Sequence, residues 1–289
     1  MASLKEVRIR IGSVNSTKQI TSAMKMVSAA KLRRAQDAIT RMRPYAEKLT
    51  AILGNVSASP PARESKFGLQ RDVKRVLLVA ISSNRGLAGA FNSQVSRSVK
   101  RLIAEHSGVE VKVLSIGKKS SDTWKRTSWH AADLPDNLAS VYDGLNFDKV
   151  APVAEAIMEK FSNGDYDKVL LVYNRFKNAG TQVLTEEAYL PVSPPTAAAT
   201  TAVGAKGIVA DYLMEPDRGT IVQEIVPKSL KIQLYKALLD SNASEHGARM
   251  TAMHKATDYA DSLLKELKLT YNKARQASIT NEILEIVGG

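Results

Sequence analysis

The sequence contains no cysteine, and only 6% of its 289 residues are aromatic. The missing thiols exclude disulfide scaffolds, thiolate catalysis, cysteine-bound zinc and iron–sulfur clusters. Long apolar runs are missing too: the longest, such as residues 76–81, fall far short of the roughly 20 residues that a membrane helix needs. We therefore expect no membrane-spanning segment, and the 44% of apolar residues can supply a sizeable core.

Recognisable catalytic motifs are also missing. The phosphate-binding pattern GxxxxGK[ST] fails because Lys112 stands where its first glycine is required, before Gly117. Neither HExxH nor GxSxG occurs. His246 and His254 lie too far apart on one predicted helix to bind a metal together without a third element. We expect no catalytic, cofactor-binding or metal-binding residues.

Positive charge is in excess, with 41 Lys and Arg against 29 Asp and Glu, and it is unevenly placed. Of the net +12, residues 1–57 hold +8, residues 58–216 hold +3 and residues 217–289 hold +1. A basic N-terminal segment suits nucleic acid, anionic lipid or an acidic protein surface, because long-range attraction does not discriminate among them.

Proline is missing from the first 43 residues, where Gly12 is the only glycine. This composition permits one long helix over residues 1–57. Apolar residues recur alternately four and three positions apart towards both of its ends, which is the spacing of a left-handed coiled coil. The middle of this seam is polar, at Lys18, Thr21, Lys25 and Ser28.

Residues 217–289 repeat this behaviour. No proline follows Pro227, and Gly247 is the only glycine between it and the terminal pair. The same apolar spacing has a polar interruption at Asn242, His246 and Arg249. At 1.5 Å per residue the two helices would be roughly 85 and 105 Å long, too long for either to bury its apolar stripe in one small domain. We expect them to pack against each other.

The lengths also predict a register. If both helices leave the domain at one height, near Ser57 and Asp217, equal rise places Leu4 opposite residue 270. The C-terminal helix would then extend about 18 residues, or roughly 27 Å, beyond its partner.

Residues 58–216 follow a different pattern. Strands are predicted at residues 75–81, 109–116, 168–176 and 182–190, and helices at residues 91–106 and 148–161. Such alternation favours an α/β sandwich with mostly parallel strands, and the short link at residues 177–180 predicts a final hairpin. The predicted fold class is α/β, with a Rossmann-like domain inserted between two long helices that form an antiparallel left-handed coiled coil.

Gly86 and Gly89 lie between a predicted strand and a predicted helix, where a glycine loop can cradle phosphate. The loop does not match GxGxxG, and glycines at such a turn more often serve positive φ and tight packing. We favour a structural loop, and keep as an alternative an enzyme that binds NAD or ATP here.

Four blocks resemble the gamma subunit family of F-type ATP synthases: residues 24–32, 82–92, 244–253 and 271–283. The likeness runs from Ala2 to Gly288. It implies a non-catalytic rotor shaft that couples ion flow through a membrane c ring to ATP synthesis or hydrolysis on beta subunits. The implied partners are a ring of three alpha and three beta subunits, the epsilon subunit and the c ring, with no nucleic acid.

The resemblance also implies individual roles. Rotor–stator contacts are expected at Met24, Lys25, Lys31, Arg33, Arg34, Arg275, Gln276, Thr280 and Glu282. An apolar bearing tip is expected at Ile279, Ile283, Ile286 and Val287. Without the resemblance, the basic group at residues 31–34 would be read as a solvated helix face.

Two further alternatives concern the basic N-terminal segment. A nucleic-acid-binding protein would interleave basic with aromatic residues, but this segment has only Tyr45. Residues 1–43 are rich in Arg and Ser like a mitochondrial transit peptide, yet a cleaved address needs no in-phase heptads. We therefore expect no removable segment. The resemblance implies a protein peripheral to an energy-coupling membrane, on the cytoplasmic side of a bacterial plasma membrane, with the mitochondrial inner membrane as the alternative.

Overall fold

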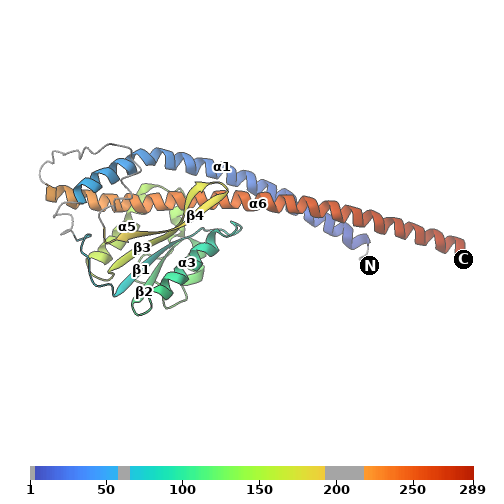
Figure 1. Cartoon of the computed structure of the whole chain (residues 1–289). Coiled ribbons are helices and arrows are strands. Elements are labelled where there is room, and N and C mark those ends of the chain that lie inside the picture. The colour runs from blue at the N-terminus through green and yellow to red at the C-terminus, as the bar shows by residue number, and fades with distance from the viewer. Residues whose placement is uncertain (1–3, 58–65, 193–217) are drawn as a thin grey trace.

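The computed structural model describes residues 4–57, 66–192 and 218–289. Two long helices dominate it, α1 (Leu4–Ser57) and α6 (Arg218–Gly288). They lie side by side and run in opposite directions, with α6 between α1 and a sheet (Figure 1). Both predicted long helices are therefore confirmed.

The sheet has four strands in the order β2-β1-β3-β4. Its strands are β1 (Arg75–Ile81), β2 (Glu110–Ile116), β3 (Lys168–Asn178) and β4 (Thr181–Leu190). The first three are parallel and β4 returns antiparallel beside β3, as the hairpin prediction required. Residues 76–81 are buried without exception, because helices cover both faces of this central strand.

One face of the sheet is covered by α3 (Phe91–Glu105) and α4 (Lys118–Trp124), the other by α5 (Phe147–Ser162) and the beginning of α6. Val95 and Val99 of α3 pack with Leu78 of β1, whereas Ile157 of α5 packs with Val79. Neither α4 nor the 3-10 helix Leu138–Tyr142 was expected from the sequence, since both are short and have no clear apolar period.

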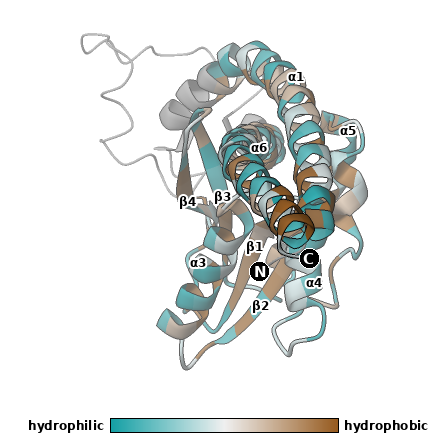
Figure 2. Cartoon of the chain, turned by 90° about the vertical axis from the view of Figure 1, so that its right-hand side faces the viewer, coloured by the Kyte–Doolittle hydropathy of each residue, from teal (hydrophilic) through white to brown (hydrophobic). Residues whose placement is uncertain are grey.

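The beginning of α6 belongs to the core of the α/β domain as well as to the helix pair. Leu230, Leu234, Ala237 and Leu238 are buried in the cluster that also contains β1, β3 and α5. Figure 2 shows α1 on the side of α6 that faces away from the sheet. The helix is thus apolar on two sides here, one for the sheet and one for α1.

Three polar contacts fix how α1 and α6 are aligned: Lys18 with Asp261, Thr21 with Thr257, and Lys25 with His254. In each pair the residue numbers add up to 278 or 279, so Leu4 is level with residue 275. The prediction that Leu4 lies opposite residue 270 was wrong. The prediction took Ser57 and Asp217 to lie at one height, whereas the three pairs give a register five residues further along α6, so α6 extends about 14 residues beyond Leu4.

Candidate functional site

The α1 seam that the sequence predicts faces α6. Every position of the series that alternates three and four residues apart is buried or half-buried as far as Leu49: Leu4, Val7, Ile11, Val14, Lys18, Thr21, Lys25, Ser28, Leu32, Ala35, Ile39, Met42, Ala46 and Leu49. The apolar series of α6 is likewise buried or half-buried as far as Ala274: Ile232, Tyr235, Leu239, Met253, Ala256, Ala260, Leu263, Leu267 and Ala274. Ala277 is exposed because α1 has ended there. We call residues 4–28 of α1 and 249–288 of α6 the shaft.

The middle of the shaft seam is polar and internally paired. Lys18 Nζ lies 2.5 Å from Asp261 Oδ1, and this ammonium lowers the pKa of the Asp261 carboxyl. The hydroxyl oxygens of Thr21 and Thr257 are 2.9 Å apart. Thr21 is only 9% exposed, and its hydroxyl donates to the Lys18 carbonyl of its own helix while it accepts from Thr257.

The shaft is joined to the α/β domain by a buried ion pair on α6. Arg249 Nη1 lies 2.7 Å from Glu245 Oε1, and both side chains are at most 9% exposed. The same guanidinium donates to the backbone carbonyls of Arg85 and Gly86, in the loop that follows β1. Burial raises the pKa of Glu245, and the charge of Arg249 opposes this rise. We call this contact the loop joint.

His246 lies beside the loop joint. Burial, with the nearby positive charges of Arg249 and Lys31, lowers its pKa to about 4. The ring is therefore neutral near pH 7, as befits a packing residue next to two cations.

The glycine loop is held inward by its own residues. Ser83 N–H donates to Asn92 Oδ1, and Asn84 Oδ1 accepts from the N–H of Lys118. Gly89 has φ +58, so its conformation favours glycine. The backbone carbonyls of Arg85 and Gly86 accept hydrogen bonds from Arg249. On the side facing α6 the loop therefore presents carbonyl acceptors rather than the N–H donors that would bind phosphate. This geometry favours the structural loop over the nucleotide-binding alternative.

A second loop holds α6 at the same height. The turn between β3 and β4 places the Ala179 carbonyl where Thr251 Oγ1 donates to it at 3.1 Å. A Cβ on Gly247 would lie 3.2 Å from that carbonyl oxygen, so the glycine permits the close approach. Residues 245–252 of α6 thus contact two loops of the α/β domain.

The predicted rotor–stator residues fall into two groups at different heights. Met24 and Lys25 are half-buried against α6. Lys31, Arg33 and Arg34 are exposed, as are Arg275, Gln276, Thr280 and Glu282. Lys25 is level with His254 and Arg275 is level with Leu4, so about 30 Å of helix separates the groups and the structure does not bring them together.

The four residues of the predicted bearing tip are exposed on the single-helical end of α6. Ile286 and Val287 are 80% and 79% exposed, and Ile279 and Ile283 about half. Figure 1 shows this end of α6 continuing past the start of α1. Four large apolar side chains on one isolated helix end are typical of a surface that another protein covers.

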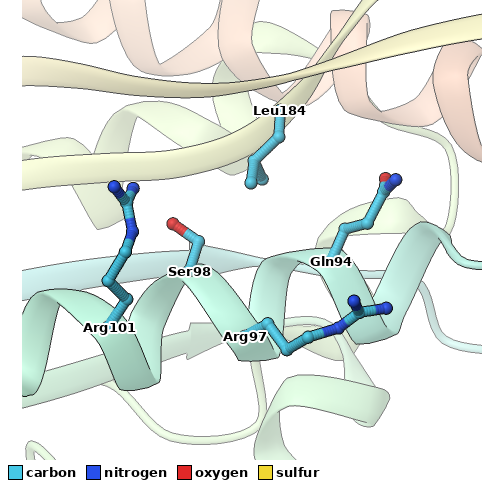
Figure 3. A pocket seen from close by; sticks show the side chains of 5 residues that line it. All are labelled: Gln94, Arg97, Ser98, Arg101 and Leu184. Carbon is cyan, nitrogen blue, oxygen red and sulfur yellow. The ribbon is translucent and has the colours of Figure 1, made fainter.

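A shallow groove lies elsewhere, between α3 and β4. It has a volume of about 240 Å³ and is lined by Gln94, Arg97, Ser98, Arg101 and Leu184 (Figure 3). Glu186 of β4 accepts hydrogen bonds from Ser98 and Arg101 across it. The central polar groups are thus paired within the domain, and they hold α3 on the sheet.

Comparison with known proteins accounts for this architecture. Residues 3–289 match the sequence model of the ATP synthase family. The ATP synthase gamma chain of Flavobacterium psychrophilum is 56% identical, with 100% of this chain and 98% of the relative covered. The gamma chain of Geotalea daltonii is 39% identical with the same coverage. The chain belongs to the ATP synthase gamma family.

Solved structures agree with membership of the gamma family. A chain of the Tetrahymena thermophila mitochondrial ATP synthase central stalk and c-ring structure is 28% identical, with a TM-score of 0.60. That match covers 82% of this chain and 99% of the other. A chain of the Euglena gracilis mitochondrial ATP synthase has the same fold at 21% identity, with a TM-score of 0.63 over 99% of this chain and 92% of the other.

Membrane-spanning helices and metal clusters are both missing from the part of the chain that the structure describes. None of the helices there has a stretch long and apolar enough to cross a bilayer. No group of three or more His, Asp or Glu side chains within residues 4–57, 66–192 and 218–289 is arranged to hold a metal ion.

Proposed function

We propose that the chain is the non-catalytic central rotor of an ATP synthase. It turns inside a ring of three alpha and three beta subunits, and so couples ion flow through the c ring to ATP synthesis or hydrolysis on the beta subunits. Family membership supports this function, as does the likeness to the Tetrahymena chain, which was solved as part of a central stalk with a c ring.

The observation that carries the proposal is the long antiparallel helix pair that ends in a single exposed helix. We infer that α1 and α6 wind around each other as a left-handed coiled coil, because the seam keeps a seven-residue repeat. Such a rod differs from side to side, so it can favour a different conformation in each of three otherwise identical catalytic subunits. Rotation would then exchange their nucleotide affinities.

Two levels of the α1–α6 helix pair would meet the stator. At the lower level the exposed basic residues Lys31, Arg33 and Arg34, with Met24 and Lys25 beside them, suit an acidic loop of the beta subunit. At the upper level Arg275 and Gln276 would hydrogen-bond a second loop, flanked by Thr280 and Glu282. The two levels follow from the separation of these groups by about 30 Å of helix.

The tip would turn within an apolar collar of the alpha and beta subunits. The exposed Ile279, Ile283, Ile286 and Val287 support this assignment. Apolar contacts are non-directional, so a collar of this kind opposes rotation little.

The three parts of the chain would have separate mechanical roles. Residues 1–57 and 217–289 would supply the two long helices that carry the shaft, and residues 58–216 would supply the foot that rests on the c ring and binds the epsilon subunit. The protein would be peripheral to the membrane, on the cytoplasmic side of a bacterial plasma membrane, which its bacterial relatives support.

The double substitution R275A/Q276A tests this function in the assembled complex. We expect ATP-driven proton pumping to fall at least about tenfold at equal amounts of complex, the effect of losing one contact worth ~1.4 kcal/mol. Far-UV circular dichroism should not change, because both side chains are exposed on the helix. The matched control is Q94A/R97A, which removes the same two side-chain types from α3. Unchanged pumping and assembly in R275A/Q276A would remove these residues from the contact.

A further inference from the structure

We propose that the polar pairs in the middle of the shaft are a register lock, which fixes how far α1 can slide along α6. The lock consists of Lys18–Asp261, Thr21–Thr257 and Lys25–His254. It concerns the chain's own alignment, and it stands whether or not the chain rotates.

Apolar heptads alone leave the register weakly defined. Above the lock, towards the tip, the seam consists of apolar residues such as Val7, Val14, Leu263 and Leu267, which repeat every seven positions and pack similarly after a slip of one heptad. A slip of seven residues moves one helix about 10 Å along the other. It would raise or lower the tip by the same distance.

The lock makes the slipped registers unfavourable. If Lys18 moves seven residues towards the end of α6, it leaves Asp261 and meets Lys268, a like charge, while Lys25 takes its place beside Asp261. In the same slip the buried Thr21 loses the hydroxyl of Thr257 and faces the apolar Leu264. After the slip the Thr21 hydroxyl keeps only its bond to the Lys18 carbonyl in its own helix. The loss of the bond between the helices and the pair of like charges are both unfavourable, so polar seam residues specify one register at some cost in stability.

The opposite slip is also disfavoured. It places Thr21 beside Met250 and takes Lys18 from Asp261 to His254. The native register is therefore the one in which each of the three polar pairs is complete.

A charge reversal at Lys18 gives a directional test. In K18D the native register opposes Asp261 with a second carboxylate. The slip towards the end of α6 instead pairs position 18 with Lys268, and Asp261 with Lys25. K18D should therefore favour this slip, whereas the double variant K18D/D261K should restore the native register, since its exchanged charges again attract.

Introduced cysteines report the register directly, because the natural chain has none. Val14 and Leu264 lie one heptad beyond the Thr21–Thr257 contact, so V14C/L264C reports the native register. V14C/Y271C reports the slipped one. The measurement is the ratio of the two disulfide formation rates in the full-length chain under mild oxidation, in otherwise natural, K18D and K18D/D261K backgrounds.

We expect K18D to lower the native-to-slipped ratio about two- to fivefold, the factor for a partly exposed ion pair, and K18D/D261K to restore it. The control R10D makes the same change of charge at an exposed α1 position outside the seam, and should leave the ratio unchanged. If K18D does not fold, as judged by circular dichroism, K18Q replaces it, because it too removes the clash with Lys268. An unchanged ratio in K18D or K18Q, or no restoration in the double variant, would overturn the lock.

Discussion

Replacement of Arg249 with methionine tests the loop joint between α6 and the α/β domain. The guanidinium is paired with Glu245 at 2.7 Å and donates to the carbonyls of Arg85 and Gly86. Removal of one partner from a buried ion pair costs about 3–5 kcal/mol, because the other charge stays buried and unpaired. We therefore expect R249M to lower the free energy of unfolding by ~3 kcal/mol near neutral pH.

The loss should depend on pH in a defined direction. Burial raises the pKa of Glu245 in the folded state, and without Arg249 it rises further. The folded variant then binds a proton more readily than the unfolded chain does, so stability is lost as the pH rises through the folded-state pKa. His246 acts in the same direction, since removal of Arg249 relieves the lowering of its pKa. The deficit of R249M should be smaller at pH 5 than at pH 8.

Urea unfolding followed by the fluorescence of Trp124 and Trp129 measures this deficit at both pH values. The matched control is K255M, which removes an exposed cation from the same helix. The double variant E245Q/R249M removes the stranded charge and should recover part of the loss. The reasoning is refuted if R249M stays within about 0.5 kcal/mol of K255M, the range of neutral surface changes, or if its deficit is equal at both pH values.

Packing and burial support three further predictions. G12A should raise the thermal midpoint of unfolding, because alanine is favoured over glycine in helices by about 1 kcal/mol and nothing lies within 4 Å of the added Cβ. G247A should show no such gain, because its Cβ would lie 3.2 Å from the carbonyl oxygen of Ala179. An equal gain in both variants would contradict this reasoning. His246 has a folded-state pKa of about 4, below its ordinary value of 6.5, so the free energy of unfolding of the unsubstituted chain should fall as the pH drops from 6.5 towards 4. H246Q should reduce this pH dependence of the free energy of unfolding, measured by urea titration. An unaltered pH dependence would exclude His246 as its source. L234A should lower the free energy of unfolding by about 2–5 kcal/mol, because Leu234 is fully buried in the core. L269A, at a 63% exposed site, should lower it by less than about 0.5 kcal/mol. Similar losses in the two variants would argue against α6 as a core element.

The two long helices, α3, α5 and the four strands could be predicted from the sequence because each has a clear apolar pattern, whereas α4 and the 3-10 helix have none. The seam of α1 could be assigned residue by residue, since a spacing of four and three positions places every member on one face. Strand β1 was recognisable from a continuous β-branched and apolar run, which is typical of a strand buried on both faces.

Contacts between distant segments could not be predicted in the same way. The predicted register of the shaft relied on where each helix leaves the α/β domain, and no local pattern specifies that. The pairing of Arg249 with the carbonyls of Arg85 and Gly86 joins positions about 160 residues apart. The only signal was the polar interruption of the α6 seam at Arg249, which showed that something other than an apolar partner lies there.

The central claim, that α1 and α6 turn as one shaft, is tested most directly by watching the α/β domain while the alpha and beta subunits are fixed to a surface. K100C supplies a single attachment site for a bead on the exposed face of α3, because the chain has no other cysteine. With ATP present, the bead should turn in one direction. A bead that stays still while the complex hydrolyses ATP at its normal rate would contradict the account.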